Sequence, residues 1–287
     1  MAYDFKAIDV VANLLTPEVV QSRPAWSREF HKGKIKVKDD TVNGVTVEEM
    51  VERMDRAGID IALVPAVKLG IDGYKHHWRL DYKEVYKLME RYPGRFYGLV
   101  GIDPYESLKG IKELEILVRD YGFVGAHFYP HWFDMPPDDP KVYPFYMKCA
   151  ELGVPFSLQV GHCLRYSQER RTKSTGRPIA LDNVANDIPE VNIIGLHTGY
   201  PWITEMISVA WKNPNVYIAI DAYAPKYMPH ELFHFANSWG KEKVLFGTDF
   251  PVIDFERARR EVEELGFREE SKRLLLRENA LRLFKFS

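Results

Sequence analysis

Two apolar stretches near the ends of the chain decide the fold: Ala-Ile-Asp-Val-Val-Ala-Asn at residues 7–13 and Leu-Phe-Gly-Thr-Asp-Phe-Pro at residues 245–251. Each consists mainly of small, β-branched or aromatic residues and carries a polar side chain near its end, Asn13 in the first and Asp249 in the second. Buried strands of a parallel sheet have this apolar character, and their polar ends lead into functional loops. We predict that the two stretches are the first and last strands of one sheet.

Six further apolar runs lie between them, separated by amphipathic segments with helical spacing. The eight predicted strands are Ala7–Leu14, Ile61–Val67, Phe96–Asp103, Gly125–Pro130, Pro155–Gly161, Asn192–Gly199, Val216–Tyr223 and Val244–Pro251. The predicted helices are Val47–Ala57, Tyr82–Arg91, Leu108–Tyr121, Val142–Leu152, Ile203–Lys212, Pro229–Ser238, Phe255–Leu265 and Glu269–Phe284, and Leu15–Gly44 is the longest predicted loop. Eight such repeats favour a closed (β/α)₈ TIM barrel of the α/β class over an open sheet. Because no linker or low-complexity tract interrupts the repeats, we predict a single domain over residues 1–287.

The composition narrows the class of protein. The formal net charge of −2 gives no overall attraction to nucleic acid or acidic membranes. The only cysteines, Cys149 and Cys163, predict neither a disulfide framework nor a cysteine-type zinc site. No apolar run approaches 18 residues and the first residues do not form a signal peptide. We expect a cytoplasmic protein that acts on a small molecule, binds no nucleic acid and no membrane, and has room for a homo-oligomer interface.

Polar side chains gather at the predicted carboxyl ends of the strands, where a barrel builds its site. They are Asp9, Asn13, His127, Gln159, His162, His197, Asp221 and Asp249. Imidazole, carboxylate and amide groups together can perform acid–base catalysis or hold a hard to borderline metal. We predict catalytic roles for Asp249, His197 and His127.

Packing offers an alternative role for every one of these residues. We expect Asp9 to brace the barrel through hydrogen bonds. Asp249 follows an apolar strand without a basic neighbour in sequence, and an unpaired buried carboxylate is costly, which favours function. His197 has glycines on both sides in Gly-Leu-His-Thr-Gly, which also favours function. The choice between packing and function stays open for Asn13, His127, Gln159, His162 and Asp221.

The loop after the fifth strand is strongly basic. Residues 163–180 contain four arginines and Lys173 against one acid, Glu169. Such a run is usually solvated, but this one leaves the active end of a strand, and the planar arginine fork suits a carboxylate or phosphate. Aromatic side chains near the barrel mouth suit a flat ligand. The predicted substrate-binding residues are Asn13, Gln159, His162, Arg165, Arg177, Tyr129, Trp202 and Asp221.

Short motifs in a fixed order make the chain similar to a known family. They are Ile8-Asp9, Met54-Asp55-Arg56-Ala57-Gly58-Ile59, Tyr92-Pro93-Gly94-Arg95-Phe96, Gly122-Phe123-Val124-Gly125-Ala126-His127, Cys149-Ala150-Glu151-Leu152-Gly153-Val154-Pro155, Gly195-Leu196-His197-Thr198-Gly199, Phe246-Gly247-Thr248-Asp249-Phe250-Pro251 and Asn279-Ala280-Leu281-Arg282-Leu283-Phe284. The chain resembles the amidohydrolase-related family, the branch of the amidohydrolase superfamily with aminocarboxymuconate-semialdehyde decarboxylase-like and lactonase-like enzymes. The resemblance covers essentially the whole chain and implies a (β/α)₈ barrel.

The resemblance also implies a metal, held by an Asp-x-His-x-His motif in the first strand, a histidine of strand 5 or 6 and the aspartate of the last strand. His197 and Asp249 match this pattern. Val11 and Asn13 stand in place of the two first-strand histidines, and Gln159 stands where the strand-5 histidine is usually found. Catalytic zinc normally has three good protein ligands, so we expect either no metal or one divalent ion, zinc or manganese. The ligands predicted for such an ion are His127, His197 and Asp249.

Three functions follow from these observations. The first is a hydrolase for a small anionic ester, lactone or amide, cyclic or aromatic ones included, in which Asp249 takes a proton from water and His197 orients the substrate carbonyl. The second is a carboxy-lyase that uses an altered mononuclear metal site. The third is a ligand-binding barrel without catalysis, which Val11 and Asn13 suggest and which the cost of keeping buried ionisable groups disfavours.

Overall fold

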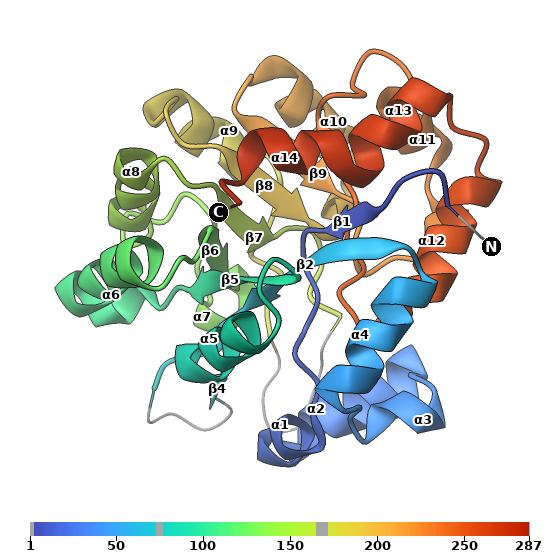
Figure 1. The fold of residues 1–287 in the computed structure, drawn as a ribbon. Coiled ribbons are helices and arrows are strands. Elements are labelled where there is room, and N and C mark those ends of the chain that lie inside the picture. The colour runs from blue at the N-terminus through green and yellow to red at the C-terminus, as the bar shows by residue number, and fades with distance from the viewer. Residues whose placement is uncertain (1–2, 73–76, 165–171, 287) are drawn as a thin grey trace.

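The chain forms a closed parallel barrel surrounded by helices (Figure 1). The computed structural model describes residues 3–72, 77–164 and 172–286. Its eight barrel strands are β1 (Ala7–Asp9), β2 (Ile59–Pro65), β5 (Phe96–Gly101), β6 (Gly125–Phe128), β7 (Phe156–Gln159), β8 (Ile193–Leu196), β9 (Val216–Ala219) and β10 (Val244–Leu245). They follow one another around the barrel in chain order, and each neighbouring pair is parallel. The predicted (β/α)₈ architecture is confirmed.

The two stretches that predicted the fold lie side by side and close the barrel. The backbone N–H of Val10 donates to the carbonyl of Phe246 over 3.0 Å, and that of Asp249 donates to Val11 over 2.9 Å. A third bond runs from the Asn13 N–H to the Phe250 carbonyl over 2.9 Å. The first and last strands therefore bring Asn13 and Asp249 to the same point.

Helices follow the strands along the chain. Those of the outer layer are α4 (Val47–Arg56), α5 (Tyr82–Arg91), α6 (Ser107–Asp120), α8 (Tyr143–Leu152), α9 (Ala180–Asp187), α10 (Ile203–Lys212), α11 (His230–Ala236) and α12 (Phe255–Glu264). Several starts are fixed by side-chain caps: Thr46 accepts the N–H of Glu49 at α4, and Asp254 accepts that of Arg257 at α12. Short helical turns in the connections are α7 (Pro130–Phe133), η2 (Pro104–Glu106), η3 (His197–Gly199) and η4 (Pro225–Tyr227).

The structure corrects several predicted boundaries. The paired strands are shorter than the apolar runs, because the runs continue into loops that carry the polar side chains; Asn192–Gly199, for example, ends in the turn η3. The segment Leu15–Gly44, predicted as a loop, contains α1 (Pro17–Ser22), α2 (Ala25–Glu29), η1 (Phe30–Ile35) and α3 (Asp39–Val42). The hairpin strands β3 (Lys68–Leu69) and β4 (Trp78–Arg79), and helix α9, were not predicted. The last predicted helix consists of α13 (Glu269–Arg273), η5 (Leu274–Glu278) and α14 (Asn279–Leu283).

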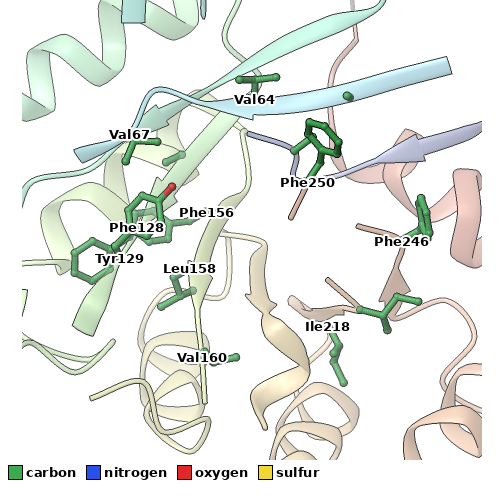
Figure 2. Close-up of a cluster of buried hydrophobic side chains, with 14 of the residues drawn as sticks. Val64, Val67, Phe128, Tyr129, Phe156, Leu158, Val160, Ile218, Phe246 and Phe250 are labelled. Carbon is green, nitrogen blue, oxygen red and sulfur yellow. The ribbon is translucent and has the colours of Figure 1, made fainter. Parts of the chain in front are cut away.

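Alternate strand residues separate two apolar layers. Ala62 and Val64 belong to the layer between the strands and the outer helices, whereas Leu63 belongs to the cluster inside the barrel. Figure 2 shows part of the outer layer, in which the rings of Phe128 and Phe156 lie 6.3 Å apart.

The C-terminal segment closes one end of the barrel. Leu283 and Phe284 pack with Tyr97 and Val124 in the interior cluster, and the ring of Phe286 lies 4.9 Å from that of Tyr97. Tyr97 and Val124 lie at the amino ends of β5 and β6, so this end is filled. In Figure 1, α14 lies near the top of the view and α1–α3 lie near the bottom. The carboxyl ends of the strands therefore remain for a site. Within the described residues, no helix is long and apolar enough to span a membrane.

Candidate functional site

A cavity opens at the carboxyl ends of β7, β8, β9 and β10. Its volume is ≈ 60 Å³, and its polar side is formed by His131, Gln159, His162, His197 and Asp249. This is the face at which barrel enzymes place their chemistry. The structure thus brings four of the predicted site residues together and adds His131, which was not predicted.

Apolar side chains cover the polar side from above. Phe30 and Ile35 come from η1, and Leu164 and Val252 come from the loops after β7 and β10. The ammonium group of Lys34 donates to the Leu164 carbonyl over 2.7 Å, so η1 and the loop after β7 contact each other across the mouth. The segment predicted as a long loop is therefore an ordered helical cover.

Asp249 is held between an amide and an imidazole. Asn13 Nδ2 donates to Asp249 Oδ1 over 2.8 Å and also to the Phe250 carbonyl over 2.8 Å. Asp249 Oδ2 lies 3.8 Å from His197 Nε2. One carboxylate oxygen is fixed by hydrogen bonding, and the other faces the imidazole in the cavity.

Asp221 lies beneath His197 and is fully buried. Its Oδ1 accepts the backbone N–H of His197 over 2.7 Å, and its Oδ2 lies 3.3 Å from His197 Nε2. Burial raises the pKa of Asp221 well above its usual value, and the nearby charge of Asp249 adds to this. The Asp221 carboxyl therefore keeps its proton to a higher pH than an exposed aspartate does, and it faces the His197 imidazole. The prediction that Asp221 binds substrate gains no support from this position, since Asp221 contacts His197 and does not line the cavity.

The backbone around the cavity is strained. His197, Ala222 and Asp249 have φ angles of 62°, 62° and 52°, in the left-handed region that residues other than glycine rarely adopt. They follow three successive strands, β8, β9 and β10. Such strain costs about 1–3 kcal/mol per residue and persists where surrounding bonds impose it, which is common at functional sites. Here the Asp249 N–H bond to Val11 and the His197 N–H bond to Asp221 impose it.

Asp9 braces the barrel, as predicted. Its Oδ1 accepts the backbone N–H groups of Val11 and Thr248 over 3.1 and 3.0 Å, and its Oδ2 accepts the Thr248 hydroxyl over 2.6 Å. Burial raises the pKa of Asp9 to about 7, although these hydrogen bonds lower it. The side chain is fully buried and joins the first strand to the last.

The raised pKa of Asp9 makes stability depend on pH. Between pH ~4 and ~7 the folded chain keeps the Asp9 proton that the unfolded chain has released, so stability falls as pH rises through this window. We expect the free energy of unfolding of the native protein to fall by about 2–3 kcal/mol between pH 5 and 8, relative to the Asp9→Asn variant. Urea unfolding of both proteins at several pH values measures this difference. Parallel pH curves for the two proteins would show that Asp9 stays ionised in the fold.

His127 lies inside the barrel and does not line the cavity. It is in register with Gly101 and Ser157, and its Nδ1 lies 3.5 Å from the Ser157 hydroxyl. Burial lowers the pKa of His127 to about 3, so the ring is neutral. Its Nε2 is buried and makes no hydrogen bond to any residue that the structure describes. The predicted catalytic role of His127 beside His197 and Asp249 therefore gains no support from its position.

Three other predicted substrate-binding residues, Trp202, Arg177 and Tyr129, do not line the cavity. The Trp202 ring packs edge-on against His162 at 4.7 Å, and the Arg177 guanidinium lies 5.4 Å above Trp202. Arg177 is paired with Glu205 over 3.0 Å and does not line the cavity. Tyr129 is buried against His127, with ring centroids 4.4 Å apart. Arg165 lies outside the described residues.

His131 is the site residue that sequence reasoning missed. It lies in α7, directly after β6, and is almost fully buried. Its Nδ1 accepts the backbone N–H of Thr175 over 3.0 Å. Burial, followed by the influence of His162, lowers the pKa of His131 to about 4. The signal in the sequence was a histidine just beyond a strand end, in Phe-Tyr-Pro-His, outside the run taken as the strand.

The donor set does not fit a catalytic divalent metal. Val11 offers no ligand atom, and the Asn13 amide donates to Asp249 and Phe250. Within residues 3–72, 77–164 and 172–286, no three His, Cys, Asp or Glu side chains are placed so that they could hold a metal ion. The predicted ligand set of His127, His197 and Asp249 is thus not assembled in the described structure.

Comparisons with known proteins agree with this architecture. Residues 39–286 match the family model described as "Amidohydrolase". An uncharacterized TIM-barrel protein from Bordetella bronchiseptica is 23% identical, with a TM-score of 0.77 and coverage of 97% of this chain and 98% of that one. The 5-carboxyvanillate decarboxylase from Sphingomonas paucimobilis is 15% identical, with a TM-score of 0.72 and coverage of 99% and 100%. A dihydroxybenzoic acid decarboxylase from Polaromonas, solved with manganese and the inhibitor 2-nitroresorcinol, is 18% identical, with a TM-score of 0.70 and coverage of 97% and 96%.

Proposed function

The chain belongs to the amidohydrolase family, and from this premise we propose that it is a carboxy-lyase that removes CO₂ from a small, planar carboxylic acid by proton transfer. The observation that carries the proposal is the position of His197, whose Nε2 lies between Asp221 and Asp249 at 3.3 and 3.8 Å. The similarity to two decarboxylases supports this reaction over the hydrolysis that the sequence placed first.

The proposed reaction needs a proton at the carbon that carries the carboxylate. The Asp249 carboxylate stabilises positive charge on the His197 imidazole, and the buried Asp221 carboxyl, whose pKa is raised, lies beside the same ring nitrogen. The imidazole gives its proton to that carbon, the bond to the carboxylate carbon breaks, and its electron pair returns to the conjugated system as CO₂ leaves. Asp221 and His197 then take one proton from solvent, so that one proton is consumed for each CO₂ released.

Asp249 has a second role in this proposal. Its Oδ1 is fixed by Asn13, so its Oδ2 can stay directed toward His197 while substrate binds. A preorganised carboxylate that is largely buried stabilises the charged imidazole more than solvent would. Because the donor set does not fit a metal, no step passes through one.

Carbon dioxide release from a panel of aromatic acids tests the proposal. The panel begins with dihydroxybenzoates and 5-carboxyvanillate, the compounds named for similar structures. In D₂O the product is expected to carry one deuterium at the carbon that lost the carboxylate. The Asp249→Asn variant is the control for background decarboxylation. Hydrolysis of esters by the native protein without CO₂ release from any acid would contradict the proposal.

Hydrolysis of an uncharged ester or lactone is the second candidate, and one observation favours it. No lysine or arginine lines the cavity within the described residues, so no permanent positive charge faces a substrate carboxylate. In this reaction Asp249 Oδ2 would take a proton from water, and His197 would donate to the carbonyl oxygen. A parallel panel of lactones and aryl esters separates the two reactions.

A further inference from the structure

His131 is fixed at the cavity wall by its neighbours in α7. The indole of Trp132 stacks on that of Trp26 at 4.7 Å, and the ring of Phe133 stacks on that of Phe128 at 5.7 Å. His131 directly precedes these two anchored residues in α7 and is only 2% exposed. Its ring therefore has one orientation, and substrate cannot displace it at low cost.

The hydrogen bond at Nδ1 determines the tautomer of His131. Nδ1 lies 3.0 Å from the Thr175 N–H, which can only donate, so Nδ1 must be the acceptor nitrogen. A neutral imidazole that accepts at Nδ1 carries its proton at Nε2. Since burial lowers the pKa of His131 to about 4, the ring stays in this neutral form through the physiological range. His131 is thus a hydrogen-bond donor without charge.

We call Thr175 and Gly176 the strap, because they run across His131 and fix its tautomer. The strap can lie this close to His131 only because residue 176 is glycine. A Cβ at Gly176 would lie 2.8 Å from His131 Cε1 and 2.9 Å from the Gln159 carbonyl oxygen. The Gly161 N–H donates to the Gly176 carbonyl over 2.7 Å and ties the strap to the end of β7. His131 and Gln159 are therefore neighbours under one strap, on the same cavity as His197 and Asp249.

We propose that His131 Nε2–H, beside the Gln159 amide, is the donor that binds a carboxylate or carbonyl oxygen of the substrate. Among the described residues, no lysine or arginine lines this cavity. A neutral donor of fixed tautomer holds an oxygen without neutralising the negative charge on Asp249. The hydrogen bonds that His131 makes to described residues are at Nδ1, so its Nε2–H can donate to the substrate. The assignment rests on the proposed function only for the identity of the substrate.

Nitrogen-15 NMR of histidine-labelled protein tests the tautomer without any substrate. The His131 signals are identified by their loss in the His131→Gln variant. We expect a neutral Nε2–H ring with no titration between pH 5 and 8. A ring that titrates in this range, or that carries its proton on Nδ1, would overturn the assignment even if the enzyme releases CO₂.

Ligand binding tests the contact itself, with 2-nitroresorcinol as the probe because it inhibits a similar decarboxylase. We expect His131→Phe to weaken binding about tenfold or more, and the Nε2–H signal of the native protein to shift on binding. His234→Phe, on the exposed face of α11, is the matched control and should bind like the native protein. Equal affinity of the native and His131→Phe proteins would overturn the proposal, and the signal shift decides it if that variant does not fold.

Discussion

Asp249→Asn is expected to lower kcat by about 10²–10⁴-fold and to change KM little. The substitution keeps the shape of the side chain, and its Oδ1 can still accept from Asn13 Nδ2, as Asp249 does over 2.8 Å. Asparagine also tolerates the left-handed backbone at this position, where φ is 52°. What is lost is the negative charge beside His197 Nε2. The loss therefore appears in the chemical step.

Steady-state kinetics and probe binding measure this effect together. The Asp249→Asn protein should bind 2-nitroresorcinol within about threefold of the native affinity, because the fold and the other donors are intact. Thermal unfolding provides the control for structure. If the variant turns over the best acid in the panel at the native rate, Asp249 has no role in proton transfer.

His197→Asn should also lower kcat by about 10²–10⁴-fold, the range typical of general acid–base groups. Asparagine is the appropriate replacement because it tolerates the φ of 62° found at residue 197. The variant retains the backbone N–H that donates to Asp221 Oδ1 over 2.7 Å. The missing group is the ring that carries the proton to the substrate.

Asp221 Oδ2 and His197 Nε2 lie 3.3 Å apart and should act as one unit in proton transfer. Asp221→Asn alone should lower kcat because it removes the partner of His197, whereas in the His197→Asn background the same change should have little further effect. Rates of the native protein, both single variants and the double variant give the coupling. Additive losses would mean that Asp221 supports the backbone of His197 and does not share its proton.

Much of the barrel could be predicted because its signal is local. Each apolar run from Ala7 to Pro251 contains a strand, since the strands are buried on both faces. The predicted strands were too long at their carboxyl ends. Val10 and Phe246, for example, lie just beyond the paired strands but are still buried, so their apolar character looks the same in the sequence. The cover formed by α1–α3 was missed because its helices are only four to six residues long, too short for a helical period to appear.

The site was predictable where a side chain directly ends a strand. Asn13, His197 and Asp249 were found in this way, and they meet because strands 1, 6 and 8 of the barrel converge. His131 was missed because it stands just beyond the run taken as the strand, and because its hydrogen-bond partner, Thr175, lies far along the chain. His127 was assigned to the site because it lies on a strand, but it is buried opposite Ser157 and does not line the cavity.

The choice between hydrolysis and decarboxylation was harder to predict than the site. Val11, Asn13 and Gln159 disfavour a metal, and on that ground hydrolysis was placed before decarboxylation. Metal ligands identify a cofactor and do not identify a reaction. The proposed carboxy-lyase rests instead on the position of His197 Nε2 beside Asp221 and Asp249, which suits protonation of carbon.

Turnover by metal-free protein tests whether Asp249 and His197 act without a metal. Protein is treated with dipicolinate, elemental analysis verifies that zinc, manganese and iron are removed, and CO₂ release is measured on the best acid in the panel. We expect the same kcat/KM before and after treatment and no increase on adding Mn²⁺. Loss of activity on metal removal with recovery on adding Mn²⁺ would contradict it.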